Sequence, residues 1–176
     1  MRKLKLQVQI TVNGFIAKPD GELDWMTWNW SDDIKTYVTE LTNSIDTIIL
    51  GRKLAEGFIP YWADVKANLD HPENEAGKIF TDTPKIVFSK TSNKSFWDNT
   101  IVVNGDFVSE IKKLKDASGK DIIVYGGAKF VSSLIKEDLI DEYYLFVNPV
   151  VIKEGLTIFD KILDMKKLTL TESKQF

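Results

Sequence analysis

The sequence predicts an α/β protein with three layers (αβα), in which helices cover both faces of a mostly parallel, mixed central sheet. Apolar and polar residues alternate from Leu4 to Val12, which indicates a β-strand. Further along, short apolar runs alternate with segments of helical periodicity. One such run, Ile122 to Tyr125, passes through the glycine pair Gly126-Gly127 directly into an amphipathic helix pattern. Strands that alternate with helices form crossover units, and crossover units build a parallel sheet.

Local signals place each element along the chain. Ser31 is a favourable N-cap, and Asp32 and Asp33 suit the first turn of the helix that it begins. Pro60 is expected to end a second helix, and Asp106 to cap a later one. The expected elements are, in chain order, a strand over 4–12, a helix from Ser31, a strand over 47–50, a brief helix from Gly51 to Pro60, an irregular stretch over 61–83 that is partly helical after Pro72, strands over 85–89 and 100–103, a helix from Asp106, a strand over 122–125, a helix from Ala128, and strands over 142–147 and 168–172.

Composition restricts the classes of function. A net charge of −3 argues against a nucleic-acid binder, which would carry a basic face, and no apolar run has the length of a membrane span. The absence of cysteine excludes disulfides, thiol catalysis and thiolate metal sites, and it is typical of a cytoplasmic protein. The single histidine, His71, lies in a polar run, so neither a zinc site nor a Ser-His-Asp triad is expected. Without repeats or a linker, residues 1–176 are expected to form one domain.

The glycine pair has two interpretations. A strand that turns on glycines into a helix leaves backbone N–H groups at the helix N-terminus, and such a terminus binds phosphate because the amides and the helix dipole favour an anion. The stretch is neither G-x-G-x-x-G nor a P-loop, however, and glycine after a parallel strand is often turn chemistry alone. Ligands of such sheets bind outside the carboxyl ends of the strands. Four segments are expected to meet there, namely 13–25, 51–53, 89–90 and 126–128.

Short motifs along nearly the whole chain occur in a specific order and spacing. They are T-V-N-G-F-I-A at 11–17, G-E-L-D-W at 21–25, I-I-L-G-R-K at 48–53, V-F-S-K at 87–90, V-Y-G-G-A at 124–128 and L-I-D-E-Y at 139–143, with Pro149, Gly155 and Phe159 in a late loop. This series resembles the dihydrofolate reductase superfamily. Within that superfamily, it is most similar to small bacterial proteins that resemble the reductase domain of riboflavin biosynthesis.

The resemblance implies a reductase that prefers NADPH as its cofactor. The cofactor-binding residues that it implies are Ile16 and Ala17 along the nicotinamide, Gly51, Arg52 and Lys53 at the phosphates, Ser89 and Lys90 beside the adenosine 2′-phosphate, and Gly126, Gly127, Ala128, Lys129 and Phe130 around the pyrophosphate. The charges agree, because a 2′-phosphate favours nearby Arg and Lys. Arg52 and Lys53 also have a simpler explanation as a solvated helix start. A cation there opposes the helix dipole by roughly a few tenths of a kcal/mol, and an unfavourable local choice indicates function.

The catalytic acid has three candidates. The folate enzymes place one carboxylate in the substrate pocket, and Asp24, Asp32 and Asp33 lie in the corresponding region. Asp32 and Asp33 already serve as first-turn acids, so we assign catalysis to Asp24. Family members commonly carry Asp at the position of Asn13, which keeps the turn but cannot ionise. We expect Asn13 to contact substrate.

Three tryptophans, Trp25, Trp28 and Trp30, lie beside Asp24. Clustered aromatic residues more often pack a core or a lid than bind substrate, but an aromatic wall would suit a flat ring in this loop. Trp25 is therefore assigned to the substrate pocket, and the other two are left unassigned.

The C-terminal end departs from the family pattern. Relatives usually finish with a hairpin, whereas this chain stops at Phe176, about where its turn should begin. Either the chain is shortened or a sheet edge is left for a partner chain to cover, and a homodimer is expected.

Together these features predict hydride transfer from NADPH to the carbon of a C=N or C=O bond. The substrate would be a small heterocycle or glycosylamine of the pterin or pyrimidine type, and the proton would come from Asp24 or from water that it orders. Two alternatives remain. A non-catalytic NADPH-binding sensor is favoured by Asn13, and a dimerisation module with an empty cradle is disfavoured by Arg52 and Lys53.

Overall fold

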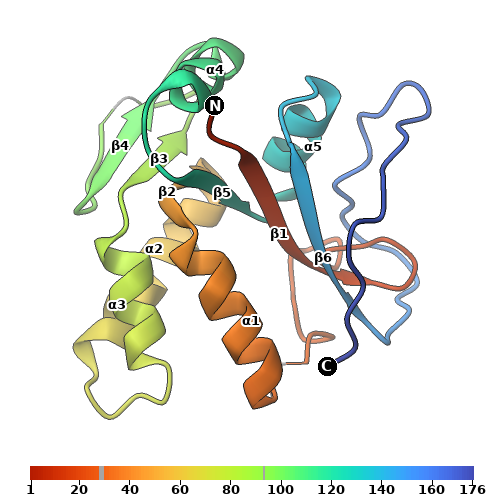
Figure 1. The fold of residues 1–176 in the computed structure, drawn as a ribbon, viewed down its shortest axis with the longest axis horizontal. Helices are drawn as coiled ribbons and strands as arrows, with labels where there is room; N and C mark the ends of the chain where they lie inside the picture. Colours follow the sequence, from red (N-terminus) through yellow and green to blue (C-terminus); the bar gives the residue numbers. More distant parts are fainter. Residues whose placement is uncertain (28–29, 93) are drawn as a thin grey trace.

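The fold is built around one parallel sheet (Figure 1). The computed structural model describes residues 1–27, 30–92 and 94–176. Six strands run in the order β4-β3-β2-β5-β1-β6, and every neighbouring pair is parallel. The strands are β1 (Leu4–Thr11), β2 (Ile45–Gly51), β3 (Lys85–Phe88), β4 (Thr100–Val103), β5 (Asp121–Tyr125) and β6 (Glu142–Asn148). An isolated antiparallel bridge joins Ala17 to Leu156 in the loops beyond β1 and β6.

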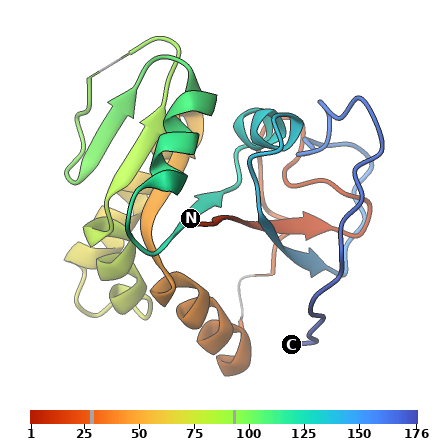
Figure 2. The same cartoon turned by 45° about the horizontal axis from the view of Figure 1, so that its top comes forward.

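Helices cover both faces of the sheet, which confirms the predicted three-layer α/β fold (Figures 1 and 2). The sheet was expected to be mixed, but all its described strand pairs are parallel, because each connection between neighbouring strands is a crossover. We call the two faces the α1 face and the α5 face. The α1 face carries α1 (Asp32–Asn43), α2 (Arg52–Ala67) and α3 (Asn74–Asp82), and the α5 face carries α4 (Phe107–Asp116) and α5 (Ala128–Lys136). None of these helices, within the ranges that the structure describes, combines the length and the apolar character needed to cross a membrane.

The alternation in β1 separates two environments. Its apolar residues, Leu4, Leu6, Val8 and Ile10, are at most 5% exposed and join the core beneath α4 and α5. Its polar residues, Lys5, Gln7, Gln9 and Thr11, therefore lie on the α1 face, because successive side chains of a strand point to opposite faces. The core of the α1 face is centred instead on β2, β3 and β5, where Ile48, Leu50, Val87 and Ile123 are fully buried.

β5 lies at a change of direction in the topology. The chain continues from β5 into α5 on one face, whereas its neighbours β2 and β1 lead to α2 and α1 on the other. Two neighbouring strands whose connections leave on opposite faces open a crevice at their carboxyl ends, and ligands of doubly wound sheets bind there. The glycine pair that ends β5 is thus placed at the crevice.

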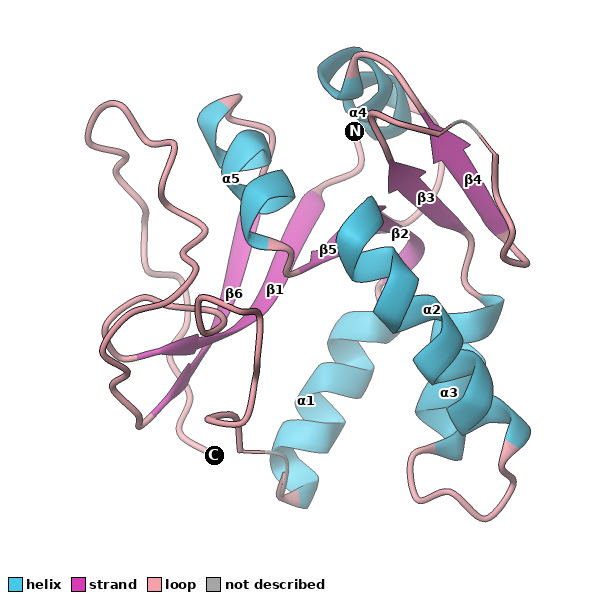
Figure 3. Ribbon diagram, turned by 180° about the vertical axis from the view of Figure 1, so that it is seen from behind, coloured by secondary structure: helices cyan, strands magenta, loops and turns pink. Residues whose placement is uncertain are grey.

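The helix predicted to end at Pro60 continues instead to Ala67, and α3 follows at Asn74 (Figure 3). A proline inside a helix costs about 3 kcal/mol, so other contacts must offset it. The Trp62 ring lies 4.4 Å from the Phe80 ring of α3, which joins the two helices. The buried Asn74 amide also donates to the carbonyls of Val65, Lys66 and Asn68, which ends α2 with satisfied acceptors.

Two further expectations need correction. The segment 168–172 forms no strand, and Leu168 and Leu170 are 53% and 83% exposed, so their period-two pattern lacks a sheet to pack on. Ser31 occupies the N-cap position of α1, but its hydroxyl donates to Asp33 and caps no amide among the described residues. The cap predicted at Asp106 is confirmed, because its carboxylate accepts the Val108 N–H at 3.0 Å.

Candidate functional site

Four consecutive strands, β3, β2, β5 and β1, end side by side at one edge of the sheet. The four segments that the sequence singled out follow directly after these strands. The parallel topology therefore brings them to a common edge, as the alternation of strands and helices predicts.

Gly51 and Phe130 lock two of these segments together. A Cβ atom on Gly51 would lie 2.9 Å from the Phe130 Cβ, so position 51 has no room for a side chain. The Phe130 ring stacks on Phe88 with centroids 5.2 Å apart, and Phe88 immediately precedes Ser89. The ends of β2 and β3 and the start of α5 are consequently one packed unit.

Two helix N-termini open at this junction, and we call the residues 51–53 and 126–130 the glycine cradle. Neither N-cap residue, Gly51 of α2 or Gly127 of α5, has a side chain to bond the first amides. Gly126 and Gly127 have φ values of +44° and +80°, in the left-handed region that glycine adopts without strain. Free N–H groups and two helix dipoles at one place favour an anion.

Cations surround the cradle. Arg52 is partly exposed and pairs with Glu56 one turn later in α2, while Lys53 and Lys129 are exposed. Ala128, the first residue of α5, is half-buried. The first turns of α2 and α5 contain no acidic residue within the described chain, so these charges have no nearby carboxylate in that turn. The residues present therefore fit a polyphosphate.

The Ser89-Lys90 segment forms a tight loop after β3. Ser89 is 7% exposed, and its hydroxyl accepts the N–H groups of Thr91 at 3.2 Å and Ser92 at 3.1 Å. Lys90 is exposed. Ser89 thus shapes the loop, while Lys90 is the member of the pair with a charge available to a ligand.

The loop after β1 is fixed by the late loop that follows β6. Ile16 and Ala17 are buried; the Ile16 N–H donates to the Leu156 carbonyl and the Leu156 N–H donates to the Ala17 carbonyl, both at 2.8 Å. Gly155 makes this approach close, since a Cβ there would lie 2.3 Å from the Ala17 carbonyl oxygen. Ile16 and Ala17 are therefore held in place by backbone contacts.

Asn13 and Asp24 are already engaged inside the protein. The Asn13 amide donates to the Ile152 carbonyl at 2.7 Å, and its oxygen accepts the Thr11 hydroxyl at 2.9 Å. Asp24 is 60% exposed and accepts a hydrogen bond from Lys18 at 2.7 Å, which raises the pKa of Lys18. Asn13 thus ties two loops together, and Asp24 is a solvated, paired carboxylate.

Asp32 and Asp33 are the first two residues of α1, and Trp30 lies just before that helix. Asp32 is exposed at the start of α1, and hydrogen bonds from the Ser31 hydroxyl and the Ile34 N–H lower the pKa of Asp33. Trp25 is 9% exposed, and its Nε1 has no hydrogen-bond partner within the described residues. Trp30 stacks on Phe146 of β6 with an interplanar angle of 8°. Trp28 lies outside the described residues.

Sequence reasoning missed two residues, Gln7 and Gln9 of β1. Their alternation with Leu6 and Val8 resembles a solvated strand face, but β1 lies inside the sheet between β5 and β6. The Gln7 side chain is buried, and neither Gln7 Oε1 nor Gln9 Nε2 has a hydrogen-bond partner among the described residues. A signal was present, because an interior strand of a parallel sheet is normally apolar on both sides.

Aromatic side chains flank these glutamines on the α1 face. Phe146 is the register partner of Gln9, and Tyr37 of α1 packs against its ring with centroids 6.2 Å apart. Beside Tyr37, a groove of about 530 Å³ runs between α1 and the C-terminal segment, where Phe176 also contacts Tyr37 and Phe146. The groove itself is lined by residues of α1 and of the C-terminal end, namely Asp33, Thr36, Tyr37, Glu40, Lys174, Gln175 and Phe176.

Comparison with known families places this site in context. The model of the RibD C-terminal domain matches residues 2–176, which is almost the entire chain. The chain belongs to the RibD C-terminal domain family. It is 34% identical to the uncharacterized protein YyaP of Bacillus subtilis (strain 168) over 99% of this chain and 89% of that protein. The predicted superfamily and branch are thereby confirmed.

Two solved structures share the fold of this RibD C-terminal domain. One is the diaminohydroxyphosphoribosylaminopyrimidine deaminase/5-amino-6-(5-phosphoribosylamino)uracil reductase of Thermotoga maritima, with a TM-score of 0.64 and 20% identity over 93% of this chain and 49% of that one. The other is a dihydrofolate reductase of Enterococcus faecalis complexed with NADP(H) and RAB-propyl, with a TM-score of 0.57 and 20% identity over 92% of this chain and 79% of that one. At this identity the likeness establishes the fold alone.

Proposed function

We propose that this RibD C-terminal domain protein is an NADPH-dependent reductase. It would reduce the C=N or C=O bond of a small heterocyclic or glycosylamine substrate of the pterin or pyrimidine type. The observation that carries the proposal is the packed junction of Gly51 with Phe130, which sets two uncapped helix N-termini side by side among cations. Family membership and the NADP(H) complex of a structural neighbour support the choice of cofactor.

The cradle residues would hold the cofactor by its phosphates. Gly51, Gly126 and Gly127 leave the amides of α2 and α5 accessible, and Ala128 and Phe130 continue the cradle along the first turn of α5. Arg52, Lys53 and Lys129 add positive charge at the same edge. Ser89 shapes the loop from which Lys90 would meet a 2′-phosphate.

NADPH would supply a hydride when bound, and the residues around it would orient it and exclude water. Ile16 and Ala17, which are buried and held by Leu156, would border the nicotinamide and exclude water from it. Water ordered by Asp24, or Asp24 itself after it takes a proton from solvent, would deliver the proton, and the Lys18 ammonium would keep the carboxyl group in place. Trp25 would form part of the substrate wall. Asn13 would contact the substrate from the turn after β1, which its hydrogen bond to the Ile152 carbonyl holds against the late loop.

Titration with NADPH and, in parallel, NADH tests the proposal. Tryptophan quenching and nicotinamide fluorescence report binding, and Arg52→Ala is the informative variant. Lys66→Ala is its matched control, because Arg52 and Lys66 are both cations of α2, both 39% exposed and each in one ion pair. Loss of a charge-assisted contact of about 1.5–3 kcal/mol should weaken NADPH binding roughly tenfold to a hundredfold in Arg52→Ala only.

The outcomes separate the alternatives. Binding of NADPH with turnover of an offered pterin or pyrimidine supports the reductase. Binding of NADPH without oxidation for any flat heterocycle would indicate the sensor instead. Failure to bind either nucleotide, or equal effects of Arg52→Ala and Lys66→Ala, would reject the cradle. One domain over residues 1–176, a homodimer and a cytoplasmic location remain predictions from the sequence.

A further inference from the structure

The sequence contains two Asn-Gly pairs, Asn13-Gly14 and Asn104-Gly105, which differ in how the structure holds them. Asparagine before glycine is prone to spontaneous deamidation, because glycine has no Cβ to hinder the approach of its amide nitrogen to the asparagine side chain. The reaction needs a free asparagine amide and a free glycine N–H. The reactivity of each pair can therefore be inferred from its hydrogen bonds.

Both reacting groups of Asn13-Gly14 are held by hydrogen bonds. The Asn13 amide donates to the Ile152 carbonyl at 2.7 Å, and its oxygen accepts the Thr11 hydroxyl at 2.9 Å. The Gly14 N–H donates to the Thr11 carbonyl at 3.0 Å. These bonds must break before the Gly14 nitrogen can attack the Asn13 side chain, so the turn after β1 protects its asparagine.

Asn104-Gly105 lacks these restraints. Both residues are exposed, and they follow Val103, the last residue of β4. None of the hydrogen bonds among the described residues engages the Asn104 side chain or the Gly105 N–H. A Cβ on Gly105 would meet nothing within 4 Å, so the pair lies in open space. The amide and the attacking nitrogen are therefore both free to react.

Asn104 lies at the carboxyl edge of the sheet, next to the loop that follows β3. β4 is the neighbour of β3, and the Ser89 N–H donates to the Val103 carbonyl at 3.0 Å. Asn104 directly follows Val103, and the exposed Lys90 directly follows Ser89. A negative charge at position 104 would consequently lie near the cation that the proposed function assigns to a 2′-phosphate.

We propose that Asn104 is a site of spontaneous deamidation, and that the carboxylate formed there weakens binding of a phosphate at the Ser89-Lys90 loop. The Gly105 nitrogen bonds to Cγ of Asn104, the bond from Cγ to Nδ2 breaks, and the amide leaves as ammonia with the proton of the Gly105 N–H. Water then opens the five-membered succinimide ring at either carbonyl, which gives aspartate or isoaspartate. Water is the only co-reactant, and nothing is oxidised or reduced. The effect on binding rests on the proposed reductase function, whereas the modification itself does not.

Peptide mass spectrometry after incubation of the full chain at mildly alkaline pH tests the site. The peptide that contains Asn104 should gain about 1 Da, because an amide becomes an acid, and both aspartate and isoaspartate should form. The Asn13 peptide should change at least about tenfold more slowly, since its hydrogen bonds must break first. Equal rates at the two positions in the folded protein, or no change at Asn104, would overturn the assignment.

Two controls show whether the structure causes the difference. Gly105→Ala leaves Asn104 in place and adds a Cβ in open space, so the fold should be kept while the attack is hindered and the mass of the Asn104 peptide stays constant. In urea, the wild type should modify both asparagines at similar rates, because unfolding removes the restraints on Asn13. Persistent protection of Asn13 in the unfolded chain would show that its hydrogen bonds are not the cause.

The effect on binding is measured with Asn104→Asp, which supplies the product, and with Asn104→Gln as the neutral control. The ratio of NADPH to NADH affinity should fall about two- to fivefold in Asn104→Asp only, and added salt should reduce the difference. An unchanged ratio in Asn104→Asp would overturn the effect on phosphate binding. If the wild type binds neither nucleotide, the reductase proposal fails and this effect fails with it, while mass spectrometry still decides the modification site.

Discussion

The two halves of the α1 face differ in whether their buried polar groups are hydrogen-bonded. Over β2, β3 and β5, the side chains of Ile48, Leu50, Val87 and Ile123 are fully buried under the helices. This half even contains a charge, Lys85, which is 2% exposed and donates to the carbonyls of Thr81 at 2.8 Å and Thr83 at 2.6 Å. Over β1 and β6, the same face carries Gln7 and Gln9, which have atoms without partners among the described residues. The first half is completed by the protein, and the second half leaves hydrogen-bonding capacity unused.

Both halves contain buried polar side chains, and they differ in whether these side chains have hydrogen-bond partners. The buried Lys85 ammonium has two acceptors, whose hydrogen bonds offset part of the cost of its desolvation. A buried amide atom without a partner costs stability, because it has lost its hydrogen bonds to water and gained none from the protein. Residues retained at a cost to stability are typical of binding sites. Four measurements can break or sharpen this comparison.

The largest effect is expected in the completed half. Ile48→Ala should lower the free energy of unfolding by about 2–5 kcal/mol, because Ile48 is fully buried and its loss leaves a cavity. Urea denaturation of the wild type and the variant measures the difference. A loss below about 1 kcal/mol would show that this half is loosely packed, and the contrast between the halves would fail.

The charge in the completed half should make stability depend on pH. Burial lowers the pKa of Lys85 from its ordinary value of 10.5 to about 8. Below this pKa, Lys85 is charged in both states and its burial is most costly. Between the two values the unfolded chain binds more protons, so stability rises with pH.

Comparison with Lys85→Met isolates that contribution. From pH about 7 to about 10, the wild type should gain roughly 2 kcal/mol of unfolding free energy relative to the variant. Urea denaturation at both pH values supplies the numbers. A relative change of the opposite sign would mean that Lys85 is stabilised as a cation.

The half of the α1 face over β1 and β6 should tolerate loss of its glutamine amides. The stability of the double variant Gln7→Leu/Gln9→Leu should lie within about 1 kcal/mol of the wild type, because removal of unpaired buried polar atoms offsets loss of the hydrogen bond from Asn148 to Gln9. Lys5→Leu is the contrasting control on the same strand, and it should destabilise because Asp121 loses its partner. A double variant that loses more than about 1 kcal/mol would make the glutamines structural.

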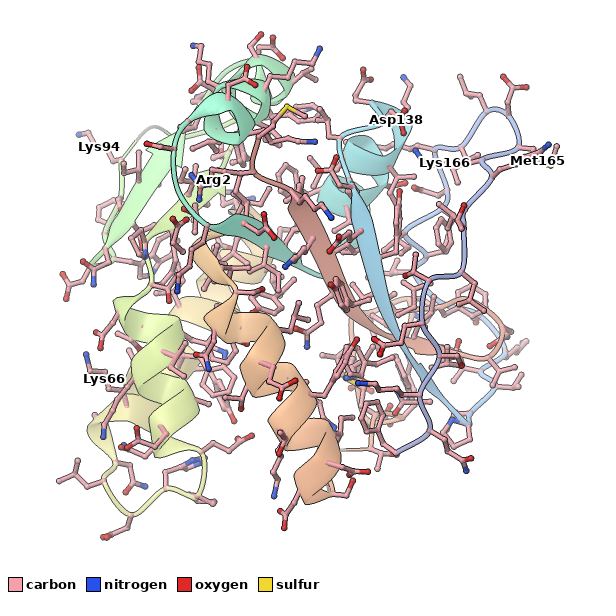
Figure 4. All side chains as sticks on the ribbon, viewed as in Figure 1. Arg2, Lys66, Lys94, Asp138, Met165 and Lys166 are labelled. Atoms are coloured by element: carbon pink, nitrogen blue, oxygen red, sulfur yellow. The ribbon has the colours of Figure 1, made fainter. Side chains whose placement is uncertain are left out.

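The smallest effect is expected on the surface of the completed half. Lys66 of α2 pairs with Asp82 of α3 at 2.6 Å, but both side chains are substantially exposed (Figure 4 labels Lys66). A double-mutant cycle with Lys66→Ala and Asp82→Ala should give a coupling below about 1 kcal/mol that falls with added salt. A larger coupling that resists salt would mean that this ion pair, and not core packing alone, joins α2 to α3.

The sequence predicts the parts of this molecule that local periodicity controls. The alternation in β1, the glycine turn after β5 and the Asp106 cap each depend on neighbouring residues, and the structure contains them. The convergence of four segments at one sheet edge also follows, because parallel strands share the direction of their carboxyl ends. The cradle could therefore be located from residue types and order.

Tertiary contacts decided the rest. Pro60 lies within a helix because Asn74, 14 positions later, satisfies the end of that helix. Leu168 and Leu170 alternate like a strand but have no sheet beside them. Gln7 and Gln9 look solvated until the position of β1 between β5 and β6 is known. In each case the deciding partner is distant in sequence, and no local pattern encodes it.

The late loop after β6 holds the molecule together without regular structure of its own. Its tip is fastened to the end of α5 by the ion pair of Lys166 with Asp138 (Figure 4). On one side of the exposed Lys153, Ile152 is bonded to Asn13; on the other, Leu156 is bonded to Ala17. A protease that cut the chain after Lys153 would leave both new ends anchored to the same N-terminal loop. The two fragments of the nicked protein should therefore stay together as a noncovalent complex, and a split reporter could be divided at this position.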